Sequence, residues 1–391
     1  MKIVVIHNKY QIGGGEDVVV ENEKKLLESK GHEVLAYFKD NTEIANYSFL
    51  RKANLINTSV WSRQSFKELR ELIEKIRPDI CHVHNYMPLI SPSVFCACDE
   101  MNVPVVQTLH NYRMLCSNAY LFRNGKVCEE CIGKSLYHAL QYGCYRDSRI
   151  QTFAVARMIE THKRRGTFKN SIDGYICLSE FAKNKFREGG LPREKLFMKP
   201  NFLFSDPGFT GSDEEYYLFA GRLDKTKGID VLVETAKIKP NLKFIIVGDG
   251  QYKTKNHKSS NIEYLGQLCK IDLIQRLQNC SALIFPSIWY EAMPMAIIEA
   301  FACGKPVIAS RLGAMVEIIE EGKTGILFEP GNAKDLASKI EWAASHQSEM
   351  HNMGANARMV FEEKYTAESN YLKLMEIYSQ AIDHRRNRVA Q

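Results

Sequence analysis

The chain has 391 residues, carries a net charge of +6 and is 45% hydrophobic. This composition is typical of a globular protein and excludes a disordered or fibrous chain, and the length predicts two or three domains. No apolar run reaches the roughly 18 residues that a membrane span needs, and the first apolar run, 3–6, predicts a buried strand rather than a signal peptide. Eleven cysteines without a secretion signal favour free thiols in a reducing cytoplasm.

Short apolar runs alternate with amphipathic stretches in both halves, a pattern typical of βαβ units. In the first half we expect strands at 3–6, 33–38, 80–84, 104–109 and 174–178, and helices at 16–30, 65–76 and after Ser179, which can cap the third. In the second half we expect strands at 216–220, 243–247, 282–285, 306–309 and 325–328, and helices at 228–236, 271–278, 296–302, 335–344 and 367–382.

We place a domain linker near residue 201, where Pro200 and Asn201 precede a segment, 205–213, rich in Pro, Gly and Ser. The sequence therefore predicts an α/β fold of two Rossmann-like, doubly wound parallel-sheet domains, 1–201 and 202–371, that face across a cleft. We expect the C-terminal helix, about 372–391, to pack back on the first domain. In such sheets ligands bind beyond the carboxyl ends of the strands.

The positive charge lies in the first half, where residues 1–201 carry 30 Lys and Arg against 22 Asp and Glu. This excess indicates either an anionic partner, such as a phosphate-bearing substrate or a membrane surface, or only a solvated basic face. Between Phe153 and Lys169, basic residues interleave with apolar ones. The stretch predicts an amphipathic helix that lies on anionic lipid, with a solvated helix as the alternative.

Two motifs of the second half predict a phosphate and sugar site. The loop 221–228 follows a predicted strand and opens a helix, and its Arg222 and Lys227 are suited to bind a phosphate at a helix N-terminus. Glu291 and Glu299, eight residues apart, flank the start of another helix. Glu299 is placed to bind a ribose hydroxyl pair and Glu291 the hydroxyls of a sugar. The alternatives are a solvated basic turn and two surface glutamates.

The first half offers a glycine loop and a strand-end histidine. Three glycines, 13–15, follow the first strand and allow backbone N–H groups to approach a phosphate or sugar. The loop is not a Gly-x-Gly-x-x-Gly fingerprint, which disfavours a dinucleotide. His110 ends the strand 104–109 and is suited to bind a sugar hydroxyl, while His82 and His84 share one face of another strand. A structural role remains the alternative for each histidine.

In this order the motifs resemble those of the retaining nucleotide-sugar glycosyltransferases of family four, which have the GT-B architecture. The resemblance covers nearly the whole chain. Its markers are the glycine loop, His110, Pro200-Asn201, Gly221-Arg222-Leu223, Lys227-Gly228, Gly248-Asp249-Gly250 and the pair Glu291 and Glu299.

The resemblance implies a role for each marker. Arg222 and Lys227 would bind the donor diphosphate, Glu299 the ribose and Glu291 the donor sugar. Gly221, Gly248 and Gly250 would shape the donor site, and Leu265, within 263–267, would flank the base. Backbone N–H groups of Met293 and Met295 would support the phosphate or sugar, His110 would face the transferred sugar, and Gly14 and Gly15 would make room for donor and acceptor. Ala292 replaces the usual Gly or Ser, and Pro294 has no N–H to donate.

Four cysteines of the segment 112–147, namely Cys116, Cys128, Cys131 and Cys144, have the spacing C-x11-C-x2-C-x12-C. Because the segment has weak periodicity and no evident core, we expect a structural zinc ion to hold it together. Plain thiols and an iron–sulfur cluster are the alternatives. No catalytic cofactor is expected, because fixed cations replace a divalent metal in this architecture.

We therefore expect a retaining transferase that moves a hexose-type sugar from UDP or GDP to a glycan, a lipid-linked intermediate of cell-surface polysaccharide. It would act in the cytoplasm, peripherally on the inner face of the membrane. A nucleotide-sugar epimerase is the alternative enzyme. A zinc-stapled nucleic-acid-binding protein is disfavoured, and no nucleic-acid partner is expected, because that reading leaves the motifs of the second half unexplained.

Overall fold

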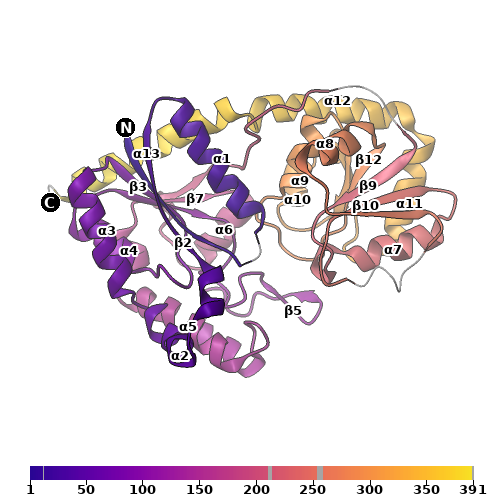
Figure 1. Ribbon diagram of the computed structural model, residues 1–391. Helices are drawn as coiled ribbons and strands as arrows, with labels where there is room; N and C mark the ends of the chain where they lie inside the picture. The colour runs from indigo at the N-terminus through magenta and orange to yellow at the C-terminus, as the bar shows by residue number, and fades with distance from the viewer. Residues whose placement is uncertain (12, 210–213, 253–258, 390–391) are drawn as a thin grey trace. The chain divides into compact units, whose positions relative to one another are not determined.

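The computed structural model describes all residues except 12, 210–213, 253–258 and 390–391, so parts of the expected linker and C-terminal helix lie outside it (Figure 1). The chain divides into two compact α/β units. Unit 1 comprises Met1–Leu121, Glu129–Phe204 and Asn370–Gln391, and unit 2 comprises Phe122–Cys128 and Ser205–Ser369. Each unit contains a six-stranded sheet. No helix in the described ranges is both long enough and apolar enough to cross a bilayer.

Unit 1 is built on a parallel sheet of order β2-β1-β3-β4-β7-β8. Its strands are β1 (Lys2–Lys9), β2 (Glu33–Asp40), β3 (Ile80–Asn85), β4 (Val105–Leu109), β7 (Gly174–Cys177) and β8 (Leu196–Met198). Its helices are α1 (Gly15–Ser29), α2 (Phe49–Thr58), α3 (Arg63–Ile76), α4 (Ser93–Glu100), α5 (Arg149–Arg164), α6 (Glu180–Glu188) and α13 (Ala367–Val389). Because residues 3–6 of β1 are all buried, both faces of the sheet are covered.

Unit 2 repeats this plan with the parallel order β11-β10-β9-β12-β13-β14. Its strands are β9 (Tyr216–Ala220), β10 (Lys243–Val247), β11 (Ile262–Gly266), β12 (Ala282–Phe285), β13 (Val307–Ser310) and β14 (Gly325–Phe328). Its helices are α7 (Ile229–Ile238), α8 (Lys270–Asn279), α9 (Met295–Ala302), α10 (Met315–Ile318), α11 (Ala333–Ser345) and α12 (Gln347–Lys364). All the expected strands are present, and the two parallel-sheet α/β domains are confirmed.

The segment between β4 and α5 contains the hairpin β5 (Phe122–Arg123) and β6 (Lys126–Val127) and a 3-10 helix, Leu136–Tyr142. The expectation that this segment has no core is wrong. Tyr112, Leu115 and Leu136 are buried, and the ring of Tyr112 stacks on Phe186 of α6 at 5.7 Å. The apolar residues of the segment are too irregularly spaced to reveal this packing as a periodic pattern.

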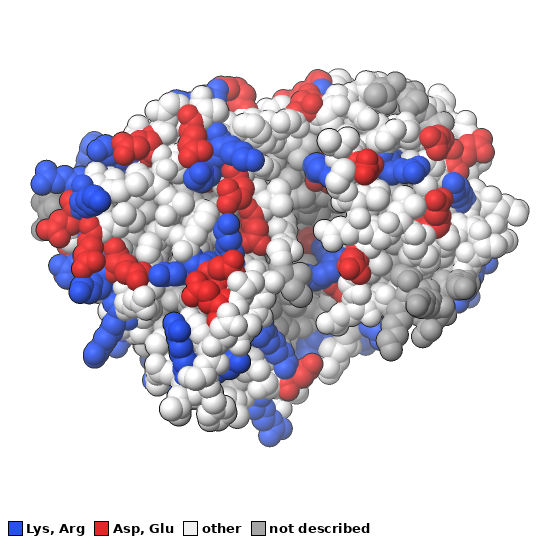
Figure 2. Space-filling model, viewed as in Figure 1, with Lys and Arg blue, Asp and Glu red and all other residues white. Residues whose placement is uncertain are grey.

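Helices α2 and α5 lie together at the lower edge of unit 1, where Figure 2 shows Lys and Arg side chains among uncharged surface. Arg157 of α5 donates to Asn57 of α2 at 2.9 Å, and His162 contacts the carbonyl of Val60 at 2.8 Å. These contacts join the C-terminal end of α2 and the turn that follows it to α5.

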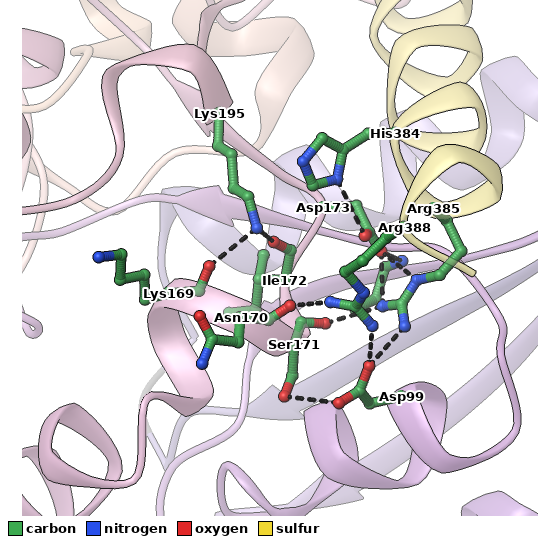
Figure 3. Close-up of polar contacts among 11 residues, drawn as sticks. Asp99, Lys169, Asn170, Ser171, Ile172, Asp173, Lys195, His384, Arg385 and Arg388 are labelled. Carbon is green, nitrogen blue, oxygen red and sulfur yellow. Dashed lines mark hydrogen bonds and ion pairs between the residues drawn. The ribbon is translucent and has the colours of Figure 1, made fainter. Parts of the chain in front are cut away.

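The C-terminal helix α13 is attached to unit 1 by a buried ion-pair cluster (Figure 3). The Arg385 guanidinium lies 2.7 Å from Asp173 and 2.5 Å from Asp99, and it donates to the carbonyl of Ser171 at 3.0 Å. Arg388 also pairs with Asp99. Both Arg385 and Asp173 are buried, so each charge depends on the other for compensation.

Candidate functional site

The strand order of unit 2 changes direction between β9 and β12, which is where open parallel sheets bind ligands. The loops that follow these two neighbouring strands meet beyond their carboxyl ends. The backbone N–H of Ile288, after β12, donates to the carbonyl of Thr226, after β9, at 2.9 Å. The motif 221–228 and the loop that leads to Glu291 therefore form one site.

Asp224 organises the loop after β9. Its Oδ1 accepts hydrogen bonds from the backbone N–H groups of Thr226 at 2.9 Å and Lys227 at 3.2 Å, and its Oδ2 pairs with Arg222. Although burial opposes ionisation, the hydrogen bonds from Thr226 and Arg222 hold the pKa of Asp224 below its ordinary value. The next residue after the turn, Gly228, has φ +73°, and a Cβ there would lie 1.8 Å from the carbonyl oxygen of Pro286. Only glycine permits this approach of the two loops.

Lys227 and Glu291 form the central ion pair of the site. The Nζ of Lys227 lies 2.6 Å from Oε1 of Glu291, whose side chain is 7% exposed. Ser287 donates to the same oxygen at 2.7 Å. The ammonium also lies 5.4 Å from the ring centre of Trp289. The lysine is thus held at the end of the sheet by a carboxylate and an aromatic face, as a preorganised cation requires.

Gly248 and Gly250 allow the loop after β10 to pack against the loop after β9. A Cβ at Gly248 would lie 1.8 Å from the carbonyl oxygen of Gly221, and one at Gly250 would lie 2.3 Å from that of Leu223. Two backbone hydrogen bonds join the loops: the N–H of Gly221 donates to the carbonyl of Val247 at 3.0 Å, and the N–H of Leu223 donates to the carbonyl of Asp249 at 2.9 Å. These glycines therefore build the site through close backbone packing.

Glu299 lies in α9, the helix that follows the Glu291 loop, and pairs there with Lys270 at the start of α8. Of the expected backbone donors, Met293 is buried before the helix and Met295 is its first residue. Leu265 is half-buried near the end of the edge strand β11. Asp224 contacts both Arg222 and the backbone N–H of Lys227. The Lys227 ammonium pairs with Glu291, and Ser287 donates to the same carboxylate. Motif reasoning missed the contacts of Ser287 and Lys270, because neither residue has a local signal.

In unit 1 the predicted residues lie at the carboxyl ends of β1 and β4. A Cβ built at Gly14 or Gly15 meets no atom within 4 Å, so this loop is open rather than tightly packed. His110 follows β4, and its Nε2 lies 2.9 Å from Nδ1 of His84. Burial, together with neighbouring His84, holds the pKa of His110 well below its ordinary value, so the imidazole is neutral.

The sequence motifs did not predict a second polar group that lies beside the glycine loop. Glu16, in the first turn of α1, accepts a hydrogen bond from the Tyr10 hydroxyl at 2.9 Å and faces Asn111 at 3.5 Å. Burial raises the pKa of Glu16 to about 8. An acidic residue in the first turn of a helix is so common that its position gave no sign of this burial.

The four cysteines of the predicted zinc site lie in the segment between β4 and α5. Cys116 and Cys131 are buried, while Cys128 and Cys144 are half-buried. Cys128 belongs to unit 2 through the β5–β6 hairpin, and the other three belong to unit 1. The zinc ion stays a prediction.

Two family models match the chain in succession. The model "Glycosyltransferase Family 4" matches residues 12–203, and "Glycosyl transferases group 1" matches residues 205–360. Together they span both units. The chain belongs to the family-four glycosyltransferases. It is therefore a transferase with the GT-B fold, as its motifs predict.

Some relatives of this glycosyltransferase match nearly its full length, and others match only part of it. An uncharacterized glycosyltransferase of Methanocaldococcus jannaschii is 25% identical over 98% of this chain and 99% of its own length. The N,N'-diacetylbacillosaminyl-diphospho-undecaprenol alpha-1,3-N-acetylgalactosaminyltransferase of Campylobacter jejuni is 30% identical over 38% of this chain and 41% of its own. HepE of Anabaena, crystallised in complex with UDP, has 18% identity, a TM-score of 0.66 and coverage of 97% of this chain and 100% of its own. The likeness to HepE shows the shared fold.

Proposed function

We propose that this glycosyltransferase moves a hexose-type sugar from a UDP- or GDP-sugar to a glycan acceptor with retention of configuration. The observation that carries the proposal is the ion pair of half-buried Lys227 with buried Glu291 at the change of strand order in unit 2. The UDP in the crystal structure of HepE, which has the same fold, supports a nucleotide-sugar donor.

The proposed chemistry follows from the charges that develop when the sugar–phosphate bond breaks. Negative charge grows on the leaving diphosphate, and Lys227 and Arg222 would stabilise it together with the N–H groups at the start of α9. Glu291 would bind sugar hydroxyls, and Glu299 would bind the ribose. The acceptor would attack on the face that the diphosphate leaves, and the departing phosphate would help to remove the acceptor proton.

We further propose a lipid-linked acceptor at an anionic membrane surface. The name of the Campylobacter relative includes a diphospho-undecaprenol acceptor, and the α2–α5 surface has the composition that binds such a membrane. We define this surface by its exposed residues Phe49, Leu50, Arg51, Lys52, Arg149, Ile150 and Phe153. The exposed fraction is 83% for Phe49 and 69% for Ile150, and apolar side chains flanked by arginine and lysine are typical of membrane-surface helices.

The basic stretch predicted from sequence contributes only in part to that surface. Val155, Met158 and Ile159 point into the core of unit 1, and His162 is buried. The exposed apolar residues are instead those at the N-terminal ends of α2 and α5. An amphipathic pattern identifies the buried face of a helix but does not show what faces solvent.

A thermal-shift screen of UDP, UDP-sugars and GDP-sugars tests the donor proposal. We expect one nucleotide class to raise the melting temperature, because a ligand that binds only the folded state stabilises it by mass action. Incubation of that donor with and without a glycan acceptor then separates transfer from epimerisation, since an epimerase changes the donor alone. Absence of any shift and of any transfer would rule out the proposed function.

A further inference from the structure

A row of buried polar side chains leads from His110 into the interior of unit 1. His110 Nε2 lies 2.9 Å from His84 Nδ1, and His84 Nε2 lies 3.4 Å from Oε1 of Glu23. The other carboxylate oxygen of Glu23 accepts from Lys199 at 2.7 Å. Glu23, His84 and Lys199 are all buried. The row joins α1, β3 and the strand end that carries His110.

Glu23 is the fixed negative charge of this row. It lies on the apolar face of α1, between Val19 and Leu26, where a charge needs a partner. Although burial opposes ionisation, the Lys199 ammonium and His82 hold the pKa of Glu23 well below its ordinary value. Glu23 is therefore a carboxylate that only accepts hydrogen bonds.

The charge on Glu23 decides which nitrogen of His84 carries the proton. Burial and the neighbouring His82 lower the pKa of His84 to about 3, so the ring is neutral and holds a single proton. A lone pair on Nε2 would face the carboxylate across 3.4 Å, and a proton there would be attracted to it. With the proton on Nε2, Nδ1 of His84 is an acceptor.

The acceptor on His84 also determines which nitrogen of His110 carries the proton. Because His84 Nδ1 can only accept, the contact at 2.9 Å requires that Nε2 of His110 donates. The proton of neutral His110 is then on Nε2, and its Nδ1 bears a lone pair. His110 is half-buried, and among the described residues no hydrogen bond is recorded at its Nδ1.

We propose that Glu23 and His84 are positioning residues that hold His110 in the tautomer whose Nδ1 accepts a hydrogen bond from a sugar hydroxyl. The inference rests on the proposed function, because it assumes that His110 faces the transferred sugar. Sugar hydroxyls donate as readily as they accept, so the tautomer selects a hydroxyl that is oriented to donate.

Glu23, His82 and His84 also present ligand atoms within 4.8 Å of one another, a spacing that suits a metal ion. Lys199 disfavours that use. Its ammonium already neutralises Glu23 at 2.7 Å, and a divalent cation would lie beside a buried positive charge. The cluster is better suited to fix hydrogen-bond directions than to bind a cation.

Nitrogen-15 NMR of the full chain, labelled at histidine, reads the tautomer directly. The His110 signals are identified by their loss in His110→Gln. We expect Nε2 of His110 to carry the proton and Nδ1 to be unprotonated at neutral pH. A proton on Nδ1 in the wild-type protein would overturn the proposal.

Two substitutions at one position separate positioning from packing. His84→Phe keeps an aromatic ring but removes the acceptor, whereas His84→Asn places an amide oxygen near the position of Nδ1. We expect that in His84→Phe the proton of His110 is no longer fixed on Nε2. We also expect kcat to fall about tenfold or more, with little change in the donor KM, as losses of supporting hydrogen bonds do. We expect His84→Asn to restore both properties in large part.

His162→Phe is the matched control, because it removes another buried histidine of unit 1 whose hydrogen bonds go to Val60 and Thr167. It should leave the tautomer of His110 unchanged. If His84→Phe does not fold, the tautomer of His110 is measured in Glu23→Gln instead. An unchanged tautomer of His110 in a folded variant contradicts the proposal. If His110→Gln retains wild-type turnover while the tautomer is as expected, the role of His110 in catalysis fails but the assignment of its tautomer stands.

Discussion

At the scale of single residues, Lys227 combines a positive charge with a fixed position. Its ammonium is held between the Glu291 carboxylate and the Trp289 ring, at the end of two adjacent strands. A cation that is already positioned needs no reorganisation when charge develops on a leaving group. Asp224 has the corresponding role for Arg222, because it pairs with the arginine and caps the turn that carries Lys227.

We predict that Lys227→Ala and Glu291→Gln each lower turnover at least about tenfold, which corresponds to about 1.4 kcal/mol or more of transition-state stabilisation. Initial rates at saturating donor measure the effect. Lys225→Ala is the control, since it removes an exposed cation from the same turn. Wild-type rates in both Lys227→Ala and Glu291→Gln would remove these residues from the site.

Glu16 makes stability depend on pH. Its pKa is about 8 in the folded protein and about 4.3 in an unfolded chain, so the folded state binds this proton more tightly. The stability that it contributes is complete below the unfolded pKa and is lost as the pH rises through about 8. We predict that the melting temperature falls between about pH 6 and pH 9 by more in the wild-type protein than in Glu16→Gln.

Glu21→Gln controls for the loss of a carboxylate from the same helix, because the Glu21 side chain is 43% exposed and its ion pair with Lys9 is 3.5 Å long. Its melting temperature should follow the wild-type pH profile. An identical profile for Glu16→Gln would show that Glu16 is not buried in its neutral form.

At the scale of elements, α13 carries a buried guanidinium that pairs with unit 1. We predict that Arg385→Met destabilises the protein by about 3–5 kcal/mol, because it leaves Asp173 buried without its partner. Urea denaturation measures the change. Arg386→Ala, which removes an exposed cation one position along the helix, should cost less than about 1 kcal/mol. Equal losses in the two variants would contradict the role assigned to the buried pair.

The cysteine-bearing segment gives a second prediction at this scale. We expect about one zinc ion per chain in purified protein, by analogy with four-cysteine structural sites, and we expect Cys131→Ser to lose it. Metal analysis by mass spectrometry is the measurement. Cys269→Ser, at an exposed position before α8, should retain the wild-type content. Zinc well below one ion per chain in the wild-type protein would end this hypothesis.

At the scale of the whole molecule, the basic charge and the exposed apolar residues of unit 1 act together on the α2–α5 surface. We predict that the protein sediments with vesicles of anionic lipid at low salt, and that binding weakens as salt screens the charges. The variant Phe49→Ser/Ile150→Ser should bind less. Leu372→Ser, which removes an exposed apolar residue of α13, should bind as the wild type does. No sedimentation at low salt would contradict the membrane proposal.

Some elements could be predicted from sequence and others could not, for identifiable reasons. Parallel strands inside a sheet are buried on both faces, so expected strands such as 3–6 and 282–285 are continuous apolar runs. Ser179 was predictable as a cap, and it accepts from Ala182 as expected. Helix α2 was not predicted, and none of its residues is buried. Strand β11 was missed because it lies at the sheet edge and is half-exposed.

The candidate site divides in the same way. Arg222, Lys227 and Glu291 lie in local motifs that follow strands, so their types and spacing could be read directly. The supporting residues lack such a signal, except for Glu23, whose place on the apolar face of α1 was a detectable anomaly. Ser287 and Lys270 are ordinary polar residues, and only their contacts give them a role.

By itself the amino-acid sequence determined the two parallel α/β domains and the motifs that mark the family, because burial and tight turns constrain residues that are close together in the chain. Only the tertiary structure decided which polar groups meet. Lys227 reaches Glu291 across 64 positions and Lys199 reaches Glu23 across 176. These pairs depend on the spatial order of strands and helices, which no local pattern encodes, and the energy of a buried charge depends on its partner.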